Sequence, residues 1–462
     1  MKNIINSIIK SWANTDGNVH STNELLTWIK ELNNTTSVSI KECSINDGNF
    51  WFYDEDNGEI LNTKNSFFSI KGSRFLKDGQ CIDEHPIIIQ SEIGYLGIIC
   101  KEIDGELNFL MQAKIEPGNI NCVQISPTIQ ATKSNFTRVH GGNYPKYFEY
   151  FENAENYRII YDQIQSEQSS RFYKKRNRNI IIIIDDEIEI YSNFRWMTLG
   201  QIKSLMEIDN LVNMDTRTVI SGIPLISANL MDEEKKELFK YFNDKSLFNS
   251  IFRARPCDTI PCIYQYINNY KMFREVSTEI VPLNKLDYWD IDQYGITANI
   301  ESNFMVKYFD ISIEGREVRN WTQPLFKAIG EATFGLIISE DNGTTKFLIS
   351  VIDEIGCFDK VEIGPSIQKE PIDNEYKNIV EKLFKQQLEN NEGILLDVML
   401  SEEGGRFYHE QNRNIIMKVD KNKIPTLPEG YFWTDYSTLN YLVQVNNCLN
   451  IQLRNLLSLL KI

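Results

Sequence analysis

The chain has 462 residues, of which 42% are hydrophobic and 24% are charged, and its formal net charge is −16. This composition is typical of a globular protein of two or three domains and argues against a disordered chain. The negative charge argues against nucleic-acid and membrane partners, because phosphate contacts need a local excess of Lys and Arg, but a few arginines are enough for a small phosphorylated ligand.

The residues that usually bind metals are few and scattered. The eight cysteines form no CxxC pair, and the four histidines form no HxH or HExxH pattern. This spacing predicts reduced thiols in a cytoplasmic protein and no metal site built by the protein. No strand leads into a GxGxxG loop, so a Rossmann-type cofactor is not predicted either, and we expect no cofactor.

In chain order, the first predicted element is a helix over residues 1–12, followed by strands in 42–56 and 87–103. Residues 105–118, GELNFLMQAKIEPG, are predicted to form a strand that ends in a turn, and 178–186, RNIIIIIDD, a buried strand. Apolar residues at helical spacing then predict helices in 198–223 and 231–248. Strands followed by helices indicate mixed sheets packed with helices, an α+β fold.

The chain contains a long internal repeat. FLMQAKIEPG (109–118) aligns with FLISVIDEIG (347–356), ISPTIQ (125–130) with IGPSIQ (363–368), and RFYKKRNRNIIIIID (171–185) with RFYHEQNRNIIMKVD (406–420). Blocks that recur in the same order predict a tandem duplication. The predicted domains are an N-terminal module over 1–222, a helical linker over 223–259 and a C-terminal module over 260–462.

The repeat separates shared residues from residues that occur once. Shared glycines and prolines, such as Gly118 and Gly356, are expected to set turn dihedrals. The shared RFY…NRN element leaves two hypotheses open, since its Arg and Asn side chains could brace the sheet or bind a diphosphate while Tyr or Trp stacks on a base. Lys114, where the second module has Ile352, and the segment 131–148 with His140 occur only in the first module. If one module is catalytic, we expect it to be the first.

QAKIEPGN…VQISPTIQATKSNFTRVHGG resembles the signature of the NDP-hexose 2,3-dehydratases, which act on dTDP-4-keto-6-deoxyglucose in deoxysugar biosynthesis. The RFY…NRN element, the VNMDTR segment and FRARP (252–256) are similar to that family too. The resemblance implies two Nudix-like modules in tandem, a homodimer, and two nucleotide-sugar sites per chain, the second vestigial. The Nudix hydrolase box is absent from both modules, so pyrophosphate hydrolysis is not expected.

The reaction that the resemblance implies is a β-elimination of water across C2 and C3, which gives a 3,4-diketo-2,6-dideoxy sugar nucleotide for a downstream 3-ketoreductase. Such a reaction needs a base, a hydrogen-bond donor to the C4 oxygen and an acid for the departing hydroxide. His140 or Glu116 is the expected base or acid, and Lys114 or Tyr144 the expected donor.

The residues predicted to bind the substrate surround these four in the sequence or belong to the repeated elements. In the first module they are Gln130, Thr132, Asn135, Arg138, Gly141, Gly142, Arg171, Tyr173, Arg178, Asn179, Trp196, Asn213 and Arg217. In the second nucleotide site they are Arg406, Tyr408, Arg413, Asn414, Trp433, Asn450 and Arg454. Two alternative functions fit the same residues, namely an epimerase or isomerase of keto-sugar nucleotides and a non-catalytic nucleotide-sugar binding protein.

Overall fold

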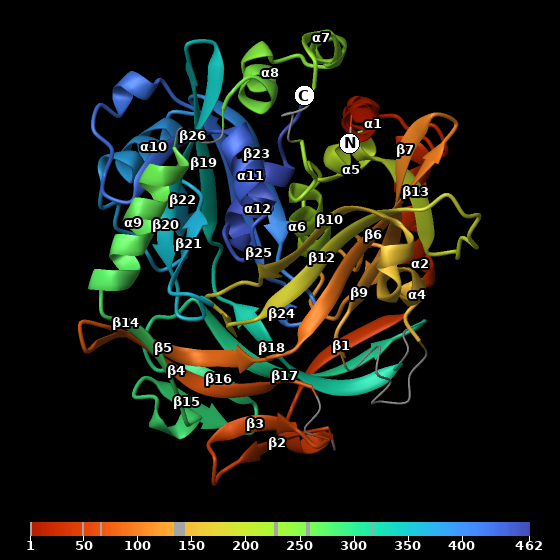
Figure 1. Cartoon of the computed structure of the whole chain (residues 1–462). Coiled ribbons are helices and arrows are strands. Elements are labelled where there is room, and N and C mark those ends of the chain that lie inside the picture. Colours follow the sequence, from red (N-terminus) through yellow and green to blue (C-terminus); the bar gives the residue numbers. More distant parts are fainter. Residues whose placement is uncertain are drawn as a thin grey trace.

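The computed structural model describes residues 2–48, 50–64, 67–133, 144–225, 230–255, 259–315 and 318–462. These residues form four β-sheets with helices packed on them, which confirms the predicted α+β class (Figure 1). The predicted strands at 105–118 and 178–186 are β7 (Glu106–Ile115) and β12 (Arg176–Ile183). The predicted N-terminal helix is α1 (Lys2–Ala13).

Two smaller sheets have the same strand order in the two halves of the chain. In the N-terminal half the order is β11 (Phe172–Tyr173), β5 (Gln80–Ile89), β4 (Ser69–Lys77), β3 (Glu59–Asn62), β2 (Trp51–Asp54). In the C-terminal half it is β24 (Phe407–Tyr408), β18 (Asn320–Ala328), β17 (Phe304–Ile313), β16 (Gly295–Ala298), β15 (Trp289–Asp292). The two sheets share one apolar core, which includes Trp51 and Trp289.

The two larger sheets repeat each other in the same way. One has the order β10 (Arg158–Ser166), β12, β6 (Ile93–Ile103), β7, β13 (Phe194–Thr198), with β8 (Val123–Ser126) on β7 and β9 (Ile129–Ala131) on β6. The other has the order β23 (Ile394–Ser401), β25 (Gln411–Lys418), β19 (Thr333–Asp341), β20 (Thr344–Asp353), β26 (Tyr431–Asp435), with β21 (Val361–Gly364) on β20 and β22 (Ile367–Lys369) on β19. The fold therefore consists of two repeated units, as the sequence repeat predicts.

The two units exchange their first strands. β1 (Val38–Cys43) leaves the N-terminal unit and pairs with β17, with Val38 opposite Ile313. β14 (Val276–Val281) leaves the C-terminal unit and pairs with β4, with Val276 opposite Lys77. Both pairings are antiparallel, so each smaller sheet contains a strand from the other half of the chain.

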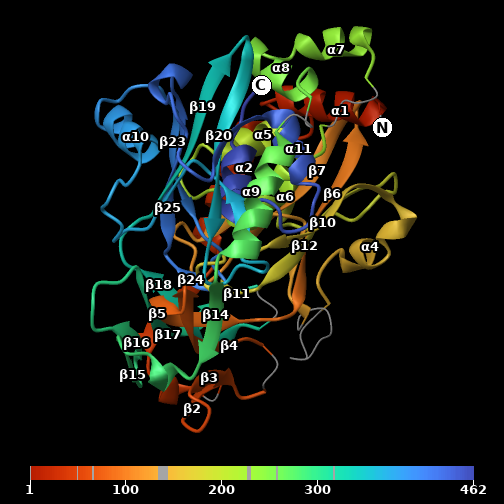
Figure 2. The same cartoon turned by 60° about the vertical axis from the view of Figure 1, so that its left-hand side comes forward.

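Helices fill the space between the two larger sheets. α6 (Met214–Ser221) packs on α12 (Ile451–Ser458), and α5 (Leu199–Leu205) and α11 (Tyr436–Leu442) lie near them (Figures 1 and 2). Asn213 and Asn450 are the N-caps of α6 and α12, and each side chain accepts a backbone hydrogen bond from the first turn. The largest apolar core cluster joins these helices to both sheets. This burial, worth about 25 cal/mol per Å² of apolar surface, holds the units together.

Two predicted helices are each divided in the structure. The segment 231–248 contains α7 (Asp232–Phe239) and the start of α8 (Lys245–Phe252), since Asp244 accepts from the backbone of the following residues and starts a new helix. The segment 198–223 contains α5 and α6 in the same way, with Asn213 as the second cap. Further α-helices of the described residues include α2 (Thr22–Thr35), α4 (Phe148–Glu152), α9 (Ile260–Phe273) and α10 (Ile379–Glu389). In the part of the chain described here, no helix combines the length and apolar character of a membrane span.

Candidate active site

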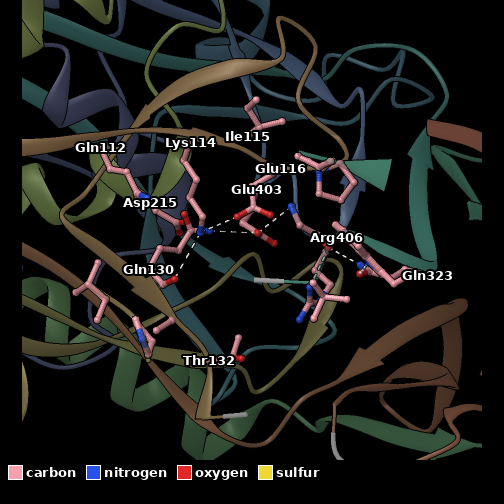
Figure 3. A pocket seen from close by; sticks show the side chains of 18 of the residues that line it. Gln112, Lys114, Ile115, Glu116, Gln130, Thr132, Asp215, Gln323, Glu403 and Arg406 are labelled. Carbon is pink, nitrogen blue, oxygen red and sulfur yellow. Dashed lines mark hydrogen bonds and ion pairs between the residues drawn. The ribbon is translucent and has the colours of Figure 1, made fainter. Parts of the chain in front are cut away.

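A cavity of about 720 Å³ lies between the two units. Its walls include β7 and β9 of the larger N-terminal sheet, the start of β18 from the C-terminal unit, and the loop before β24. Its volume is within the range of small-molecule sites, which is about 300–1,000 Å³. Figure 3 shows Lys114, Glu116 and Glu403 pointing toward one another, with Asp215 near Lys114, and Arg406 and Gln323 on the far side.

The loop before β24 reaches this cavity because the two units exchange backbone hydrogen bonds. The N–H of Gly118 donates to the carbonyl of Gly404 at 2.7 Å, and the N–H of His409 donates to the carbonyl of Gly118 at 2.9 Å. In the equivalent place, the N–H of Gly356 donates to the carbonyl of Ser169 at 2.8 Å. In each unit, the loop before the RFY sequence thus packs against the other unit.

Gly118 and Gly356 recur because of this close approach. A Cβ on Gly118 would lie 1.6 Å from the carbonyl oxygen of Phe407, and a Cβ on Gly356 would lie 1.9 Å from that of Phe172. Neither glycine has a left-handed φ. Both glycines lie in turns, as predicted, but the contact between the units, rather than the turn dihedrals, is what requires the absence of a side chain.

An ion pair and two longer contacts connect the polar side chains of the cavity. Lys114 Nζ lies 2.6 Å from Glu116 Oε1 and 3.5 Å from the carbonyl oxygen of Gln130. Gln130 Nε2 in turn donates to Glu403 Oε1 at 3.4 Å (Figure 3). Lys114 is on β7, Glu116 follows this strand directly, and Gln130 is on β9. Two strands and the loop before β24 therefore bring these groups together.

Burial changes the protonation of several of these groups. It raises the pKa of Glu403, with the Glu116 carboxylate adding to the rise and the Arg406 guanidinium opposing it. It also raises the pKa of Asp215 well above its usual value, and the pKa of Glu167 to about 7. Burial lowers the pKa of Lys175 to about 8. Neutral carboxyl groups that can donate a proton, and a lysine that can lose one, are the equipment of acid–base chemistry.

The structure brings together part of the predicted site. Lys114, Glu116, Gln130, Thr132 and Tyr144 all line the cavity. Asn135, Arg138, His140, Gly141 and Gly142 lie outside the described residues.

Asn213 contacts the cavity indirectly. Its Nδ2 donates to the Oε1 of Gln130 at 3.4 Å. Its Oδ1 accepts from the N–H of Thr216, as an N-cap does.

Other predicted substrate-binding residues are placed away from the cavity lining. Arg178 forms a two-bond ion pair with Asp162, at 2.7 and 2.6 Å. Arg217 is buried and donates to the carbonyls of Val212 and Ser401, each at 2.7 Å.

Four further predicted residues have local roles in the fold. Trp196 belongs to an apolar core cluster, and Tyr173 packs beside another. Asn179 donates to the carbonyl of Asn177 at 3.0 Å. Arg171 stacks on the Phe304 ring at 4.2 Å.

Arg406, predicted for the second nucleotide site, instead lines this first cavity. Its guanidinium lies over the Phe68 ring at 4.4 Å and donates to Gln90 Oε1 at 3.3 Å. The physical reason is the exchange of loops, which carries the arginine of the second RFY sequence into the first unit.

The other residues predicted for the second site have local partners. Arg413 pairs with Asp397, Asn414 donates to the Asn412 carbonyl, and Tyr408 stacks on Phe309 at 4.2 Å. Trp433 packs beside an apolar core cluster.

Asn450 and Arg454 repeat the roles of their counterparts in the first unit. Asn450 donates to Gln368 at 3.0 Å, and Arg454 donates to the Leu449 carbonyl at 2.7 Å and to the Ser166 carbonyl.

Sequence reasoning missed Glu403, Asp215, Glu167 and Lys175, which also line the cavity. A signal for three of them was present in the repeat, since positions 403, 215 and 175 align with Gln168, Gln452 and Glu410. The repeat alone does not reveal their place in the cavity, because it does not show that both units contribute to one site.

The equivalent region of the C-terminal unit has different chemistry. Ile352 stands in place of Lys114, and Glu354, the counterpart of Glu116, accepts a hydrogen bond of 2.8 Å from Gln368. Glu370 stands in place of Thr132, and its carboxylate lies 3.5 Å from Arg171. The lysine–carboxylate pair is thus a feature of the first cavity. Among the described residues, no group of three or more His, Cys, Asp or Glu is placed to hold a metal ion.

The chain is similar to known proteins over nearly its whole length. A family model described as NDP-hexose 2,3-dehydratase matches the chain twice, over residues 22–223 and 261–460. A dTDP-4-dehydro-6-deoxy-alpha-D-glucopyranose 2,3-dehydratase of Saccharopolyspora spinosa is 32% identical over 447 residues, which are 95% of this chain and 90% of the relative. Enzymes of the same name from Streptomyces violaceoruber and Amycolatopsis orientalis are 32% and 31% identical, over 93% and 98% of this chain and 95% and 92% of their own lengths. The chain belongs to the NDP-hexose 2,3-dehydratase family.

Proposed function

We propose that this chain eliminates water across C2 and C3 of dTDP-4-dehydro-6-deoxyglucose, giving a 3,4-diketo-2,6-dideoxy sugar nucleotide. The observation that carries the proposal is the cavity between the units, where the Lys114–Glu116 ion pair adjoins buried carboxyl groups. The family match supports the same reaction. The relatives support it too, since they are named for this dehydration and the similarity covers nearly their whole length.

The elimination begins with removal of the C3 proton, which the C4 ketone makes acidic. Glu116 is one candidate base, and His140, which lies outside the described residues, is the other. Lys114 or Tyr144 donates a hydrogen bond to the oxygen of the resulting enolate. A positioned acid or base is worth roughly 10²–10⁴-fold in rate, and one donor to a developing oxyanion about 3–4 kcal/mol.

Arg406 and Lys175 are the cations on the cavity wall that we assign to the diphosphate. A guanidinium suits this role because its fixed fork of N–H groups binds two phosphate oxygens at once. Trp51 and Trp321 also line the cavity and offer faces on which the nucleotide base can stack.

The two units have different roles in this proposal. The N-terminal unit holds the reaction, and the C-terminal unit keeps a vestigial nucleotide-sugar site, because the counterparts of Lys114 and Thr132 there are Ile352 and Glu370. We propose that both units have Nudix-like folds without the Nudix box. The repeated pairs of mixed sheets and helices are compatible with that likeness.

We further propose a homodimer, a cytoplasmic location and coupling to a 3-ketoreductase. Every cysteine among the described residues is a free thiol, which is common in reducing compartments. A ketoreductase would consume the diketone, an electrophile that calls for rapid reduction.

The test is incubation of the purified chain with dTDP-4-dehydro-6-deoxyglucose, with a 3-ketoreductase and its nicotinamide cofactor to trap the diketone. The expected trapped product has lost one water, has gained two hydrogens in the reduction and carries no C2 hydroxyl, as mass spectrometry and NMR would show. An epimerase or isomerase would give a product that keeps the water. A non-catalytic binding protein would leave the substrate unchanged over hours, and either result would contradict the proposal.

A further inference from the structure

Glu403 belongs to the C-terminal unit, but its side chain lines the cavity of the N-terminal unit. Its Oε1 accepts a hydrogen bond of 2.9 Å from the N–H of Gly405 and one of 3.4 Å from Gln130 Nε2. Both of these contacts end on Oε1, which fixes the carboxyl group and leaves Oε2 as the oxygen that can carry a proton.

Two glycines make this placement possible. A Cβ on Gly405 would lie 2.3 Å from Glu403 Oε1, so any side chain there would collide with the carboxyl group. A Cβ on Gly404 would lie 2.2 Å from Asn119 Oδ1 and 2.9 Å from Glu116 Cβ. The Gly404–Gly405 pair therefore lets the loop approach Glu116 and lets the carboxyl group of Glu403 lie over the loop.

The equivalent loop of the N-terminal unit lacks all three features. Gln168 stands in place of Glu403, and Ser169 and Ser170 stand in place of the two glycines. The loop that enters the first cavity thus has an acid where its copy has an amide, just as β7 has Lys114 where its copy has Ile352. Two differences from two separate halves of the chain meet in one cavity, which indicates a single shared task.

The surroundings of Glu403 favour its neutral form. The side chain is partly buried in the cavity wall, and its burial and the nearby Glu116 carboxylate raise the pKa of Glu403, although Arg406 and Lys114 oppose this effect. Two carboxyl groups in one site commonly share a proton, one acting as the base and the other as the acid.

We propose that Glu403 is the general acid of the elimination, which protonates the hydroxyl group leaving C2. The base first takes the C3 proton, and the electron pair forms the enolate. When the C2–O bond breaks, the oxygen keeps the two electrons of that bond and takes the proton from Glu403 Oε2, so that water leaves. The enolate electrons form the C2–C3 double bond and restore the C4 ketone, and the resulting C3 enol tautomerises to the 3,4-diketone by losing its hydroxyl proton and gaining a proton at C2. Glu403 is left as a carboxylate and takes a proton from the solvent. The base releases the proton that it took from C3 to the solvent. This assignment rests on the proposed function.

The test compares two leaving groups in the variant Glu403→Gln. On the natural substrate, loss of the general acid should slow turnover at least about a hundredfold. On the analogue with fluorine in place of the C2 hydroxyl, fluoride leaves without a proton, and the variant should release it within a few-fold of the rate of the unaltered protein. Circular dichroism and thermal unfolding would establish that the variant is folded.

Glu402→Gln is the matched control. Glu402 is the neighbouring residue and is more buried than Glu403, and its Oε1 accepts from Asn412 Nδ2 at 2.8 Å. This variant should keep the unaltered rate on both substrates. Equal slowing of Glu403→Gln on both substrates, or no slowing on the natural one, would overturn the assignment. Failure of the unaltered protein to dehydrate the natural substrate would instead refute the proposed function, and the assignment with it.

Discussion

Arg217 of the N-terminal unit donates a hydrogen bond of 2.7 Å from Nη2 to the backbone carbonyl of Ser401 in the C-terminal unit. Ser401 ends β23, and the loop before β24, which contains Glu403 and Arg406, begins directly after it. Arg217 therefore lies in contact with the base of the loop. Because the equivalent Arg454 donates to the Ser166 carbonyl, each unit holds the loop of the other by a buried arginine.

The first prediction concerns this arginine. Arg217→Met should lower the free energy of unfolding by about 3 kcal/mol or more, because two hydrogen bonds from a charged group are lost at about 1.5–3 kcal/mol each. Urea unfolding measures this change. Arg178→Met is the comparison, since the Arg178–Asp162 pair is partly exposed and its loss should cost only about 1 kcal/mol or less. Equal costs would contradict the role given to Arg217.

Lys114 should act on the rate more than on binding. Lys114→Met removes the cation beside Glu116 and the candidate donor to the C4 oxygen, so kcat should fall at least about a hundredfold while KM changes little. Steady-state kinetics at saturating substrate would show this. A variant whose KM rises while its kcat stays unchanged would place Lys114 in binding alone.

Glu116 and its counterpart Glu354 provide a matched pair. If Glu116 is the base, Glu116→Gln should abolish both water loss and the exchange of the C3 hydrogen with D₂O, with a rate loss of at least about a hundredfold. Glu354→Gln should leave both reactions near the unaltered rate, because Glu354 lies in the unit without the lysine. If the Glu116→Gln variant still exchanges the C3 hydrogen with D₂O, Glu116 is not the base and His140 is the remaining candidate.

Arg406 should contribute to the affinity for the diphosphate. Arg406→Met is expected to raise the Kd of dTDP roughly tenfold or more, since a hydrogen bond to a charged group is worth about 1.5–3 kcal/mol. Isothermal titration calorimetry measures it. Binding of thymidine, which has no phosphate, should weaken far less, and an equal loss for both ligands would show that Arg406 acts on the nucleoside end.

Ionisation of the Glu354 carboxyl group should make the free energy of unfolding depend on pH. Burial, with repulsion from Glu362 and Glu370, raises the pKa of Glu354 to about 8. A raised pKa means that the folded protein binds the proton more tightly than the unfolded chain. The corresponding stability is present below the ordinary pKa of about 4.3 and is lost as pH rises through 8.

The expected measurement is a comparison of Glu354→Gln with the unaltered protein between about pH 5 and pH 8. Because Gln cannot ionise, the variant should lose less stability over this range, by up to about 1.4 kcal/mol per pH unit. Urea unfolding at three pH values would show the divergence. Parallel curves for the two proteins would contradict the burial of a protonated carboxyl group at this position.

The apolar pattern of the sequence was sufficient to predict the strands and the repeat, because the patterns of β7 and β12 occur in both halves of the chain. It was not sufficient for the divided helices, since the caps Asp244 and Asn213 interrupt segments whose apolar spacing continues across them. It also could not show that two loops cross between units. A repeat indicates which residues are equivalent but not which copies meet in space. Arg406 was therefore assigned to the second site and Glu403 to none.

The exchange of β1 and β14 has a consequence for how this chain can be divided. Neither half contains all the strands of its own smaller sheet, and a half made alone would leave the edge of β4 or β17 uncovered. The arrangement is that of a swapped dimer whose two subunits have been joined end to end. A hybrid of two relatives cut in the linker would pair the β1 of one parent with the β17 of the other. A working hybrid would have to inherit β1 together with the C-terminal half.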